Sequence, residues 1–191
     1  MRNFACALLV TTAITTALPT IACAQQYKVD PVHSSVVFRV KHLGVSYCYG
    51  RFDKTSGTFQ LDEQNPSASA IDVVVESGSV DTSNTQRDTH LRNPDFFDAA
   101  KFPTIRFVST KVSRQGTGPY VVAGDLTLHG VTKPVTLEIE ATGSGKGMMG
   151  ETRSGLETVF NINRTDFGMD KMVGPVADEV RLMVSVEGIR Q

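Results

Sequence analysis

Four histidines are the side chains of this 191-residue chain best suited to acid–base catalysis or metal binding, and they stand far apart: His33, His42, His90 and His129. Their spacing matches neither H-x-H nor H-E-x-x-H, two arrangements by which paired histidines bind zinc. The sequence also lacks G-x-S-x-G, the turn that exposes a nucleophilic serine. We therefore expect a protein that is not an enzyme and that needs no metal ion or cofactor.

One short segment does combine the residue types of a hydrolytic relay, because Asp30, His33 and Ser34 lie within five positions. Nothing in the sequence beside them supplies an oxyanion hole or arranges them as a relay. Asp30 precedes Pro31, and an aspartate before proline favours a turn in which short polar side chains bond to nearby backbone groups. The segment is therefore interpreted as a structural corner at the entrance of the fold.

The overall charge argues against one class of partner. The chain has 19 basic and 20 acidic residues, which gives a formal net charge of -1. Binding to nucleic acid without sequence preference requires a concentrated positive field, so no nucleic-acid partner is expected. Hydrophobic residues make up 40% of the chain and recur regularly, which is enough for one domain with a sizeable core.

The first 24 residues have the layout of a secretory signal peptide. A short positive start is followed by the uncharged stretch 4–18, and residues 22–24 form an A-x-A cleavage site. One alternative is a membrane anchor, for which the stretch is too short and too rich in threonine. Another is lipoprotein processing at Cys23, where the leucine that usually begins such a site is missing. We expect cleavage after Ala24, export to the periplasm, and a soluble domain at 25–191 that does not span the membrane.

Cleavage would leave Cys48 as the one cysteine of the mature chain, because Cys6 and Cys23 lie in the signal peptide. A single cysteine cannot form an internal disulfide, so bridges do not stabilise this fold in an oxidising compartment. The simplest interpretation of Cys48 is a buried or half-buried small apolar side chain. The alternative is a reactive thiol or a bridge between two copies, which no neighbouring cysteine or acid–base motif supports.

Apolar and polar residues alternate along most of the mature chain, as in half-buried β-strands. The alternating segments are 36–42, 71–75, 105–107, 120–128, 135–140, 156–162 and 180–187, with further strand-like residues around 50–52 and 57–59. His129-Gly130 separates two of them by the two residues of a tight hairpin. The sequence therefore predicts an all-β fold, a closed antiparallel barrel of about eight strands, with a two-sheet sandwich as the alternative.

Residues 81–103 interrupt the alternation and are predicted to be a helical insertion. Residues 83–86 form a plausible helix start, and Asn93-Pro94 is typical of an N-cap followed by proline at the first helical position. We therefore expect two short helices between strands.

Phe96 and Phe97 lie in the second of these predicted helices. Adjacent residues stand about 100° apart on a helix, so at least one phenylalanine should face the barrel. The segment then either covers an edge of the barrel or acts as a lid that contacts a ligand. The pattern alone favours a filled core over a cavity, although the phenylalanines and methionines of the chain would suit an adaptable apolar pocket.

Several groups of residues occur in a characteristic order along the chain. They are 27–38 and 40–44, then 50–52, 95–103, 124–134 and 164–169, and they include Asp30-Pro31-Val32-His33-Ser34, Leu128-His129-Gly130-Val131-Thr132 and Arg164-Thr165-Asp166-Phe167-Gly168. Together they resemble the YceI-like periplasmic family of polyisoprenoid-binding proteins, over nearly all of 25–191. The resemblance implies a lipocalin-like barrel whose elongated apolar cavity holds an isoprenoid or another long-chain amphiphilic lipid, and it moves the expectation from a filled core to a cavity. It also implies a homodimer.

The expected ligand-binding residues are Phe38, Val40, His42, Phe96, Phe97, Phe107, Leu126, Leu128, Phe160, Ile162, Arg164, Phe167 and Met169. His42 shares the strand parity of Phe38, and we expect its imidazole in the apolar lumen, where it would orient a ligand head. Arg164 shares the parity of Ile162, and its planar guanidinium would suit a phosphate or carboxylate head. The alternatives are a histidine bonded to backbone near a strand end and an ion pair between Arg164 and Asp166 or another acid.

The expected function is lipid binding that serves transport, storage or a stress response. The alternatives are a filled structural or interaction barrel without a ligand and, less favoured, a hydrolase.

Overall fold

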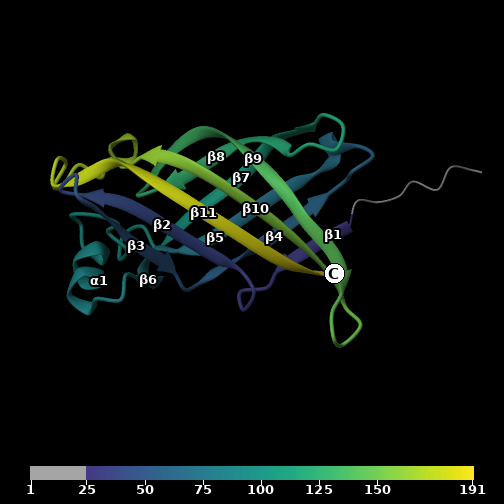
Figure 1. Cartoon of the computed structure of the whole chain (residues 1–191), viewed down its shortest axis with the longest axis horizontal. Coiled ribbons are helices and arrows are strands. Elements are labelled where there is room, and N and C mark those ends of the chain that lie inside the picture. Colours follow the sequence, from purple (N-terminus) through teal and green to yellow (C-terminus); the bar gives the residue numbers. More distant parts are fainter. Residues whose placement is uncertain (1–24) are drawn as a thin grey trace, which may run out of the picture.

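The computed structural model describes residues 25–191, and the predicted signal peptide at residues 1–24 lies outside the described residues. Eleven strands and one α-helix form this part of the chain (Figure 1). The strands are β1 (Gln25–Val29), β2 (Ser35–His42), β3 (Ser46–Phe52), β4 (Thr55–Leu61), β5 (Ala70–Glu76), β6 (Val80–Asp81), β7 (Thr104–Arg114), β8 (Tyr120–Leu128), β9 (Val131–Lys146), β10 (Thr152–Asn163) and β11 (Val176–Arg190). The helix is α1 (Thr85–Arg92), and three short 3-10 helices are η1 (Pro66–Ala68), η2 (Ser77–Ser79) and η3 (Arg164–Phe167).

The sheet closes into a barrel because β1 pairs with β4 on one side and with β11 on the other. β1 and β2 lie end to end along β11, since Val29 pairs with Gly188 and Ser35 pairs with Ser185. β3 and β4 follow one another in the same way along β2 and β1, and β6 and β5 along β3 and β4. Eight strand positions therefore surround the lumen. The predicted all-β fold and closed antiparallel barrel are confirmed, and the sandwich is not the architecture.

β8 shows how the sequence pattern produces the wall of the barrel. Tyr120, Val122, Leu126 and Leu128 are buried in the lumen, and Gly124 is buried in the same alternation, while Val121, Ala123, Asp125 and Thr127 are half-buried or exposed. Successive side chains of a strand point to opposite faces, so this alternation fixes which face is the interior. Shifting the register by one residue would expose the whole apolar set.

The predicted hairpin at His129-Gly130 joins β8 to β9. The two residues have φ angles of 52° and 75°, both in the left-handed region that a type I′ turn requires. The glycine adopts this conformation without strain. The turn prediction is therefore confirmed.

The helical insertion contains one helix and not two. α1 begins where expected, and the Asn84 side chain caps it by accepting a hydrogen bond from the Arg87 backbone N–H at 2.9 Å. The second predicted helix is wrong, because residues 94–97 form turns. Asn93 caps the C-terminus of α1, and Asp98 has a φ of 44°, which no α-helix accommodates. The chain there folds back onto α1, since the Phe97 backbone N–H donates to the carbonyl of Leu91 at 2.9 Å.

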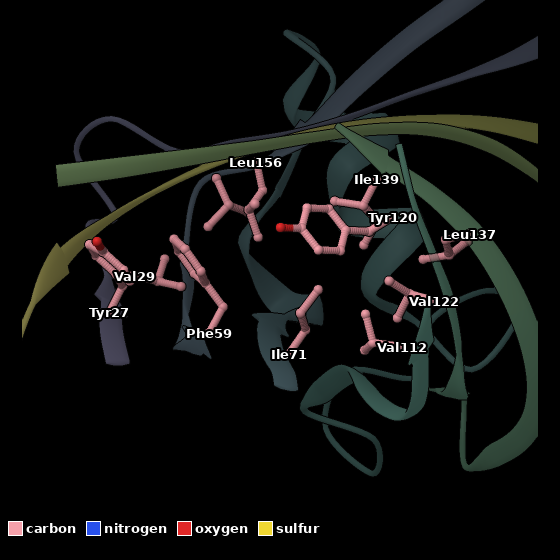
Figure 2. Close-up of a cluster of buried hydrophobic side chains, with 11 residues drawn as sticks. Tyr27, Val29, Phe59, Ile71, Val112, Tyr120, Val122, Leu137, Ile139 and Leu156 are labelled. Atoms are coloured by element: carbon pink, nitrogen blue, oxygen red, sulfur yellow. The ribbon is translucent and has the colours of Figure 1, made fainter. Parts of the chain in front are cut away.

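A packed apolar core fills the end of the barrel that contains β1. Its aromatic residues are Tyr27, Phe59 and Tyr120, and the rings of Tyr27 and Phe59 are stacked with centroids 5.2 Å apart. Figure 2 shows these side chains with their aliphatic neighbours, directed toward one another inside the barrel. Any space for a ligand must therefore lie closer to the opposite end, where α1 lies in Figure 1.

The Asp30 segment forms the expected corner between β1 and β2, but it does not lie at an entrance, because none of residues 30–34 lines a cavity of the barrel. The buried Asp30 carboxylate accepts a hydrogen bond from the Val32 backbone N–H at 3.0 Å, and it is bonded to the His33 imidazole at 2.8 Å. Arg153, on β10, donates to the same carboxylate at 2.8 Å and also to the carboxylate of Glu187. Asp30, His33 and Glu187 have the spacing of a metal-ligand group, but the Arg153 guanidinium already supplies positive charge between the two carboxylates.

Candidate ligand-binding cavity

Two adjoining apolar cavities of about 100 Å³ each lie inside the barrel. The deeper one lies next to the core that fills the β1 end, and its walls include Ile71, Val73, Leu137, Leu156, Phe160 and Val186. The outer one lies toward α1, and its walls include Phe52, Phe97, Leu128, Ile162 and Met169. Ile105, Leu126 and Leu182 line both cavities. These three side chains therefore form the junction at which the cavities meet.

A wider cavity of about 570 Å³, which we call the mouth, lies between α1 and the β2–β3 hairpin. Its walls combine Leu91 and His90 from α1 with Tyr49 and Cys48 from β3. The residues that it shares with the outer lumen cavity are Phe38, Val40, Leu91, Phe96 and Val176. The three cavities thus form one path that runs from the surface beside α1 into the barrel.

The walls of this path change character along its length. The lumen cavities are bounded almost entirely by aliphatic and aromatic side chains, whereas the mouth adds imidazole, phenol, amide and guanidinium groups. Apolar walls of this kind are chemically suited to a hydrocarbon chain, which would bury apolar surface against them, and the polar groups at the mouth are suited to a polar head.

Several of the polar groups at the mouth are held by other side chains. The Arg87 guanidinium donates to the hydroxyl and to the carbonyl of Thr82, each at 2.7 Å. His90 Nε2 lies 3.0 Å from a carboxylate oxygen of Asp95, and this hydrogen bond lowers the pKa of Asp95 below its ordinary value. His42 is exposed at the rim of the mouth and does not line either lumen cavity. The prediction of an imidazole inside the apolar lumen therefore differs from the structure, because β2 leaves the lumen at Val40.

Most of the predicted ligand-binding residues lie along this path. Those on the lumen walls are Phe38, Val40, Phe96, Phe97, Phe107, Leu126, Leu128, Phe160, Ile162, Arg164 and Met169, and His42 lies at the mouth. Phe167 is placed differently, because it is buried in a core cluster beneath a polar pocket between β9 and β10. The contacts of all these residues with a ligand stay a prediction.

Arg164 has a structural task that the sequence did not indicate. Its guanidinium donates to the backbone carbonyls of Ala177 (3.0 Å), Met169 (2.5 Å), Lys171 (2.7 Å) and Val176 (3.1 Å). Burial lowers its pKa, against the opposing charges of Asp178 and Asp170. Four of the five guanidinium hydrogens are thus used by the backbone.

The alternative that paired Arg164 with Asp166 also differs from this arrangement. The strand ends at Asn163, and Arg164 begins η3, so strand parity does not extend to it. One donor hydrogen is left for the predicted contact with a ligand head.

The junction residues Ile105 and Leu182 were not among the predicted site residues, and neither was Leu91. The lumen position of Leu182 could have been predicted from the sequence, because Leu182 shares the strand and the parity of Val180 and Val184 and alternates with outward-facing residues. Leu91 could not be found in this way, since its position depends on how α1 packs beside β6 and over the end of the lumen.

Comparison with known proteins identifies relatives of the whole barrel. A UPF0312 protein of Yersinia enterocolitica is 46% identical over 171 residues, which cover 88% of each chain. The crystal structure of a YceI protein of Campylobacter jejuni is 31% identical with a TM-score of 0.70, and the match covers 79% of this chain and 90% of that one.

A more distant structure, described as a polyisoprenoid binding domain from Saccharophagus degradans, has a TM-score of 0.65 at 16% identity. The match covers 86% of this chain and 98% of that chain, and it shows a shared fold. The YceI-like domain family itself matches residues 27–188. This chain therefore belongs to the YceI-like domain family.

Proposed function

We propose that this protein binds a polyisoprenoid or another long-chain amphiphilic lipid, with the hydrocarbon chain in the lumen and the polar head at the mouth. The observation that carries the proposal is the shared lining of the three cavities, which connects a surface opening to an apolar interior. The description of a structural relative as a polyisoprenoid binding domain supports the same ligand class.

The apolar walls favour long chains over short ones. Burial contributes about 0.8 kcal/mol per CH₂ group, so a chain of twenty carbons would contribute on the order of 16 kcal/mol. Association costs roughly 4–15 kcal/mol in lost translational and rotational freedom. A short fatty acid would not offset this cost, whereas a long chain binds without any covalent link.

The proposed compartment is the periplasm, reached through the signal peptide at residues 1–24. In an aqueous compartment bounded by membranes, a closed barrel would shield an apolar chain from water. The proposed role is that of a lipid carrier, store or stress-response binder and not that of an enzyme.

One observation favours the alternative of a filled structural barrel. Each lumen cavity measures about 100 Å³, well below the roughly 300–1,000 Å³ of common ligand pockets. A bound chain must therefore be thin, or the junction residues must move apart to admit it.

Lipid extraction separates the two functions. Protein purified without detergent is extracted with organic solvent, and the extract is analysed by mass spectrometry. We expect a long-chain lipid in stoichiometric amount. A long polyprenol added at 100 times its dissociation constant should raise the stability by about 2.7 kcal/mol, which corresponds to about 5–10 °C in melting temperature. The filled barrel predicts no extractable lipid and no stabilisation.

A further inference from the structure

Four exposed apolar side chains surround the mouth. Leu43 and Val45, in the turn between β2 and β3, are 61% and 84% exposed. Met172 and Val173, in the loop before β11, are 44% and 50% exposed. The turn and the loop lie side by side, since the Leu43 backbone N–H donates to the carbonyl of Pro175 at 2.7 Å. We call these four residues the rim patch.

A basic and aromatic surface adjoins the rim patch on the outer face of β2 and β3. Arg39 pairs with Tyr49 and Lys41 pairs with Tyr47 in the strand register. The Arg39 guanidinium lies 4.3 Å from the centre of the Tyr47 ring, and the Lys41 ammonium lies 5.5 Å from it. Cations thus flank both exposed phenols.

The positive charges of this surface are free to meet an external anion. Within residues 25–191, neither Arg39 nor Lys41 forms an ion pair. Lys41 is exposed, whereas Arg39 is half-buried and its Nε atom is covered, so an anion would meet Arg39 at its terminal nitrogens. Arg39 also pairs in register with Arg181 of β11, which places two cations side by side. The acidic residues of β11 are Asp178, Glu179 and Glu187, and Glu179 lies two residues before Arg181.

The rim patch is continuous with the entrance of the cavity path. Met172 lines the mouth, as do His42 beside the turn and Tyr49 on the aromatic surface. A lipid that leaves the lumen through the mouth would therefore pass directly over the exposed apolar side chains.

We propose that the rim patch and its basic surface dock the barrel on an anionic phospholipid bilayer, so that lipid moves between membrane and lumen. Apolar side chains enter the boundary of the acyl chains, tyrosines are favoured at the headgroup level, and each Lys or Arg near an anionic surface contributes about 1 kcal/mol. The purpose of docking rests on the proposed function, but docking itself is measurable without any ligand in the lumen.

The opposite end of the barrel provides a matched control. Met148 and Met149 in the β9–β10 hairpin are fully exposed, and that hairpin lies at the other end of the molecule from α1 (Figure 1). They line none of the three cavities of the path. Replacing them removes at least as much exposed apolar surface as changing Leu43 and Val45 does, but it leaves the mouth untouched.

Vesicle flotation tests the proposal with residues 25–191, which contain every strand of the closed barrel and omit the apolar leader that would bind vesicles by itself. The vesicles contain phosphatidylcholine alone or with 30% phosphatidylglycerol. We expect binding to the anionic vesicles, and a decrease of at least tenfold in the Leu43→Ser/Val45→Ser variant. Arg39→Ser/Lys41→Ser should weaken binding to anionic vesicles about 30-fold, since two contributions of about 1 kcal/mol are lost. Met148→Ser/Met149→Ser should bind like the unchanged protein.

Three results would overturn the proposal. The first is that the unchanged protein does not bind vesicles, and the second is that the Met148/Met149 variant loses as much vesicle binding as the Leu43/Val45 variant. The third is that binding is equally strong with and without phosphatidylglycerol. A rim patch that instead covers a second copy would give a dimer in sedimentation that the Leu43/Val45 changes dissociate, without vesicle binding, and this too would overturn it. Uptake of a soluble fluorescent polyene in the absence of vesicles measures ligand binding in the lumen independently of docking. The Leu43/Val45 variant should keep that uptake, so failure of lumen binding and failure of docking are distinguishable.

Discussion

Arg153 Nη1 lies 2.8 Å from Oδ2 of Asp30, which joins β10 to the corner between β1 and β2 across 123 positions of sequence. The same guanidinium donates to Glu151 at 2.7 Å and to Glu187, and these partners raise its pKa. The corner at which β1 gives way to β2 along β11 is thus fixed by charges from three segments of the chain: the corner itself, the start of β10 and β11.

Asp30→Asn should therefore destabilise the barrel. The amide keeps the shape but loses the charge that the buried hydrogen bonds from Val32 and Arg153 require, at a cost of about 2 kcal/mol. Lys54→Gln is the matched control, because the Lys54–Glu76 pair is exposed and contributes little. Thermal unfolding checks this, and equal melting temperatures of the two variants would contradict it.

Stability should depend on Asp30 at low pH. Its pKa is lowered from 3.8 to about 2, chiefly by the hydrogen bond with His33 and then by Arg153 and the Val32 N–H. A lowered carboxyl pKa means that the stabilisation is complete above the unfolded value near 3.8 and is lost as the pH falls through about 2. Melting temperatures between pH 5 and pH 1.5 should fall more steeply for the unchanged protein than for Asp30→Asn. Parallel curves would show that Asp30 does not contribute.

Arg164→Met should destabilise the loop that precedes β11 more than it destabilises the rest of the barrel. It leaves the carbonyls of Met169 and Lys171 without their buried donor, at a cost of about 3 kcal/mol or more. Arg164→Lys should recover part of the loss, since an ammonium can serve some of these carbonyls. Hydrogen exchange of the segment 168–176 measures this effect. Equal protection in all three proteins would contradict the structural role.

Phe97→Leu should weaken lipid retention while the fold persists. The Phe97 ring packs edge-on against Phe52 with centroids 5.4 Å apart and lines the outer lumen cavity. It therefore contacts the barrel wall and also borders the space proposed for the lipid chain. Phe96→Leu should act similarly, because Phe96 lines both the outer cavity and the mouth. If lipid retention is unchanged in both variants at native stability, the segment is a cover and not a lid.

The parts of the fold that could be predicted are those with local causes. The alternation that forms β8 and the turn at His129-Gly130 depend on neighbours in sequence, and so does the cap of α1 at Asn84. The second helix failed for the opposite reason, because contacts with α1 override the capping signal at Asn93. Helix signals are weak next to tertiary packing.

The candidate site was predictable where strand parity applies and not beyond it. The alternation along the strands predicted that Phe38 and Phe160 face the lumen, where the structure places them. The alternation does not extend to Arg164, because the strand ends one residue earlier. The closure by β1 and the partnership of Arg153 with Asp30 join segments far apart in sequence, and no local pattern indicates them.

The claim that the lumen holds a lipid chain is tested most directly by blocking the junction between its two cavities. Leu182 lines both cavities, and its neighbour Met183 has the opposite parity on β11. Leu182→Phe places a ring in the path, and Met183→Phe adds the same ring to the outside of the same strand. The measurement is the ratio of bound lipid to protein by mass spectrometry after native purification, with melting temperatures of both variants to confirm the fold. We expect at least a tenfold loss of lipid in Leu182→Phe and none in Met183→Phe, whereas equal lipid in two stable variants would contradict binding in the lumen.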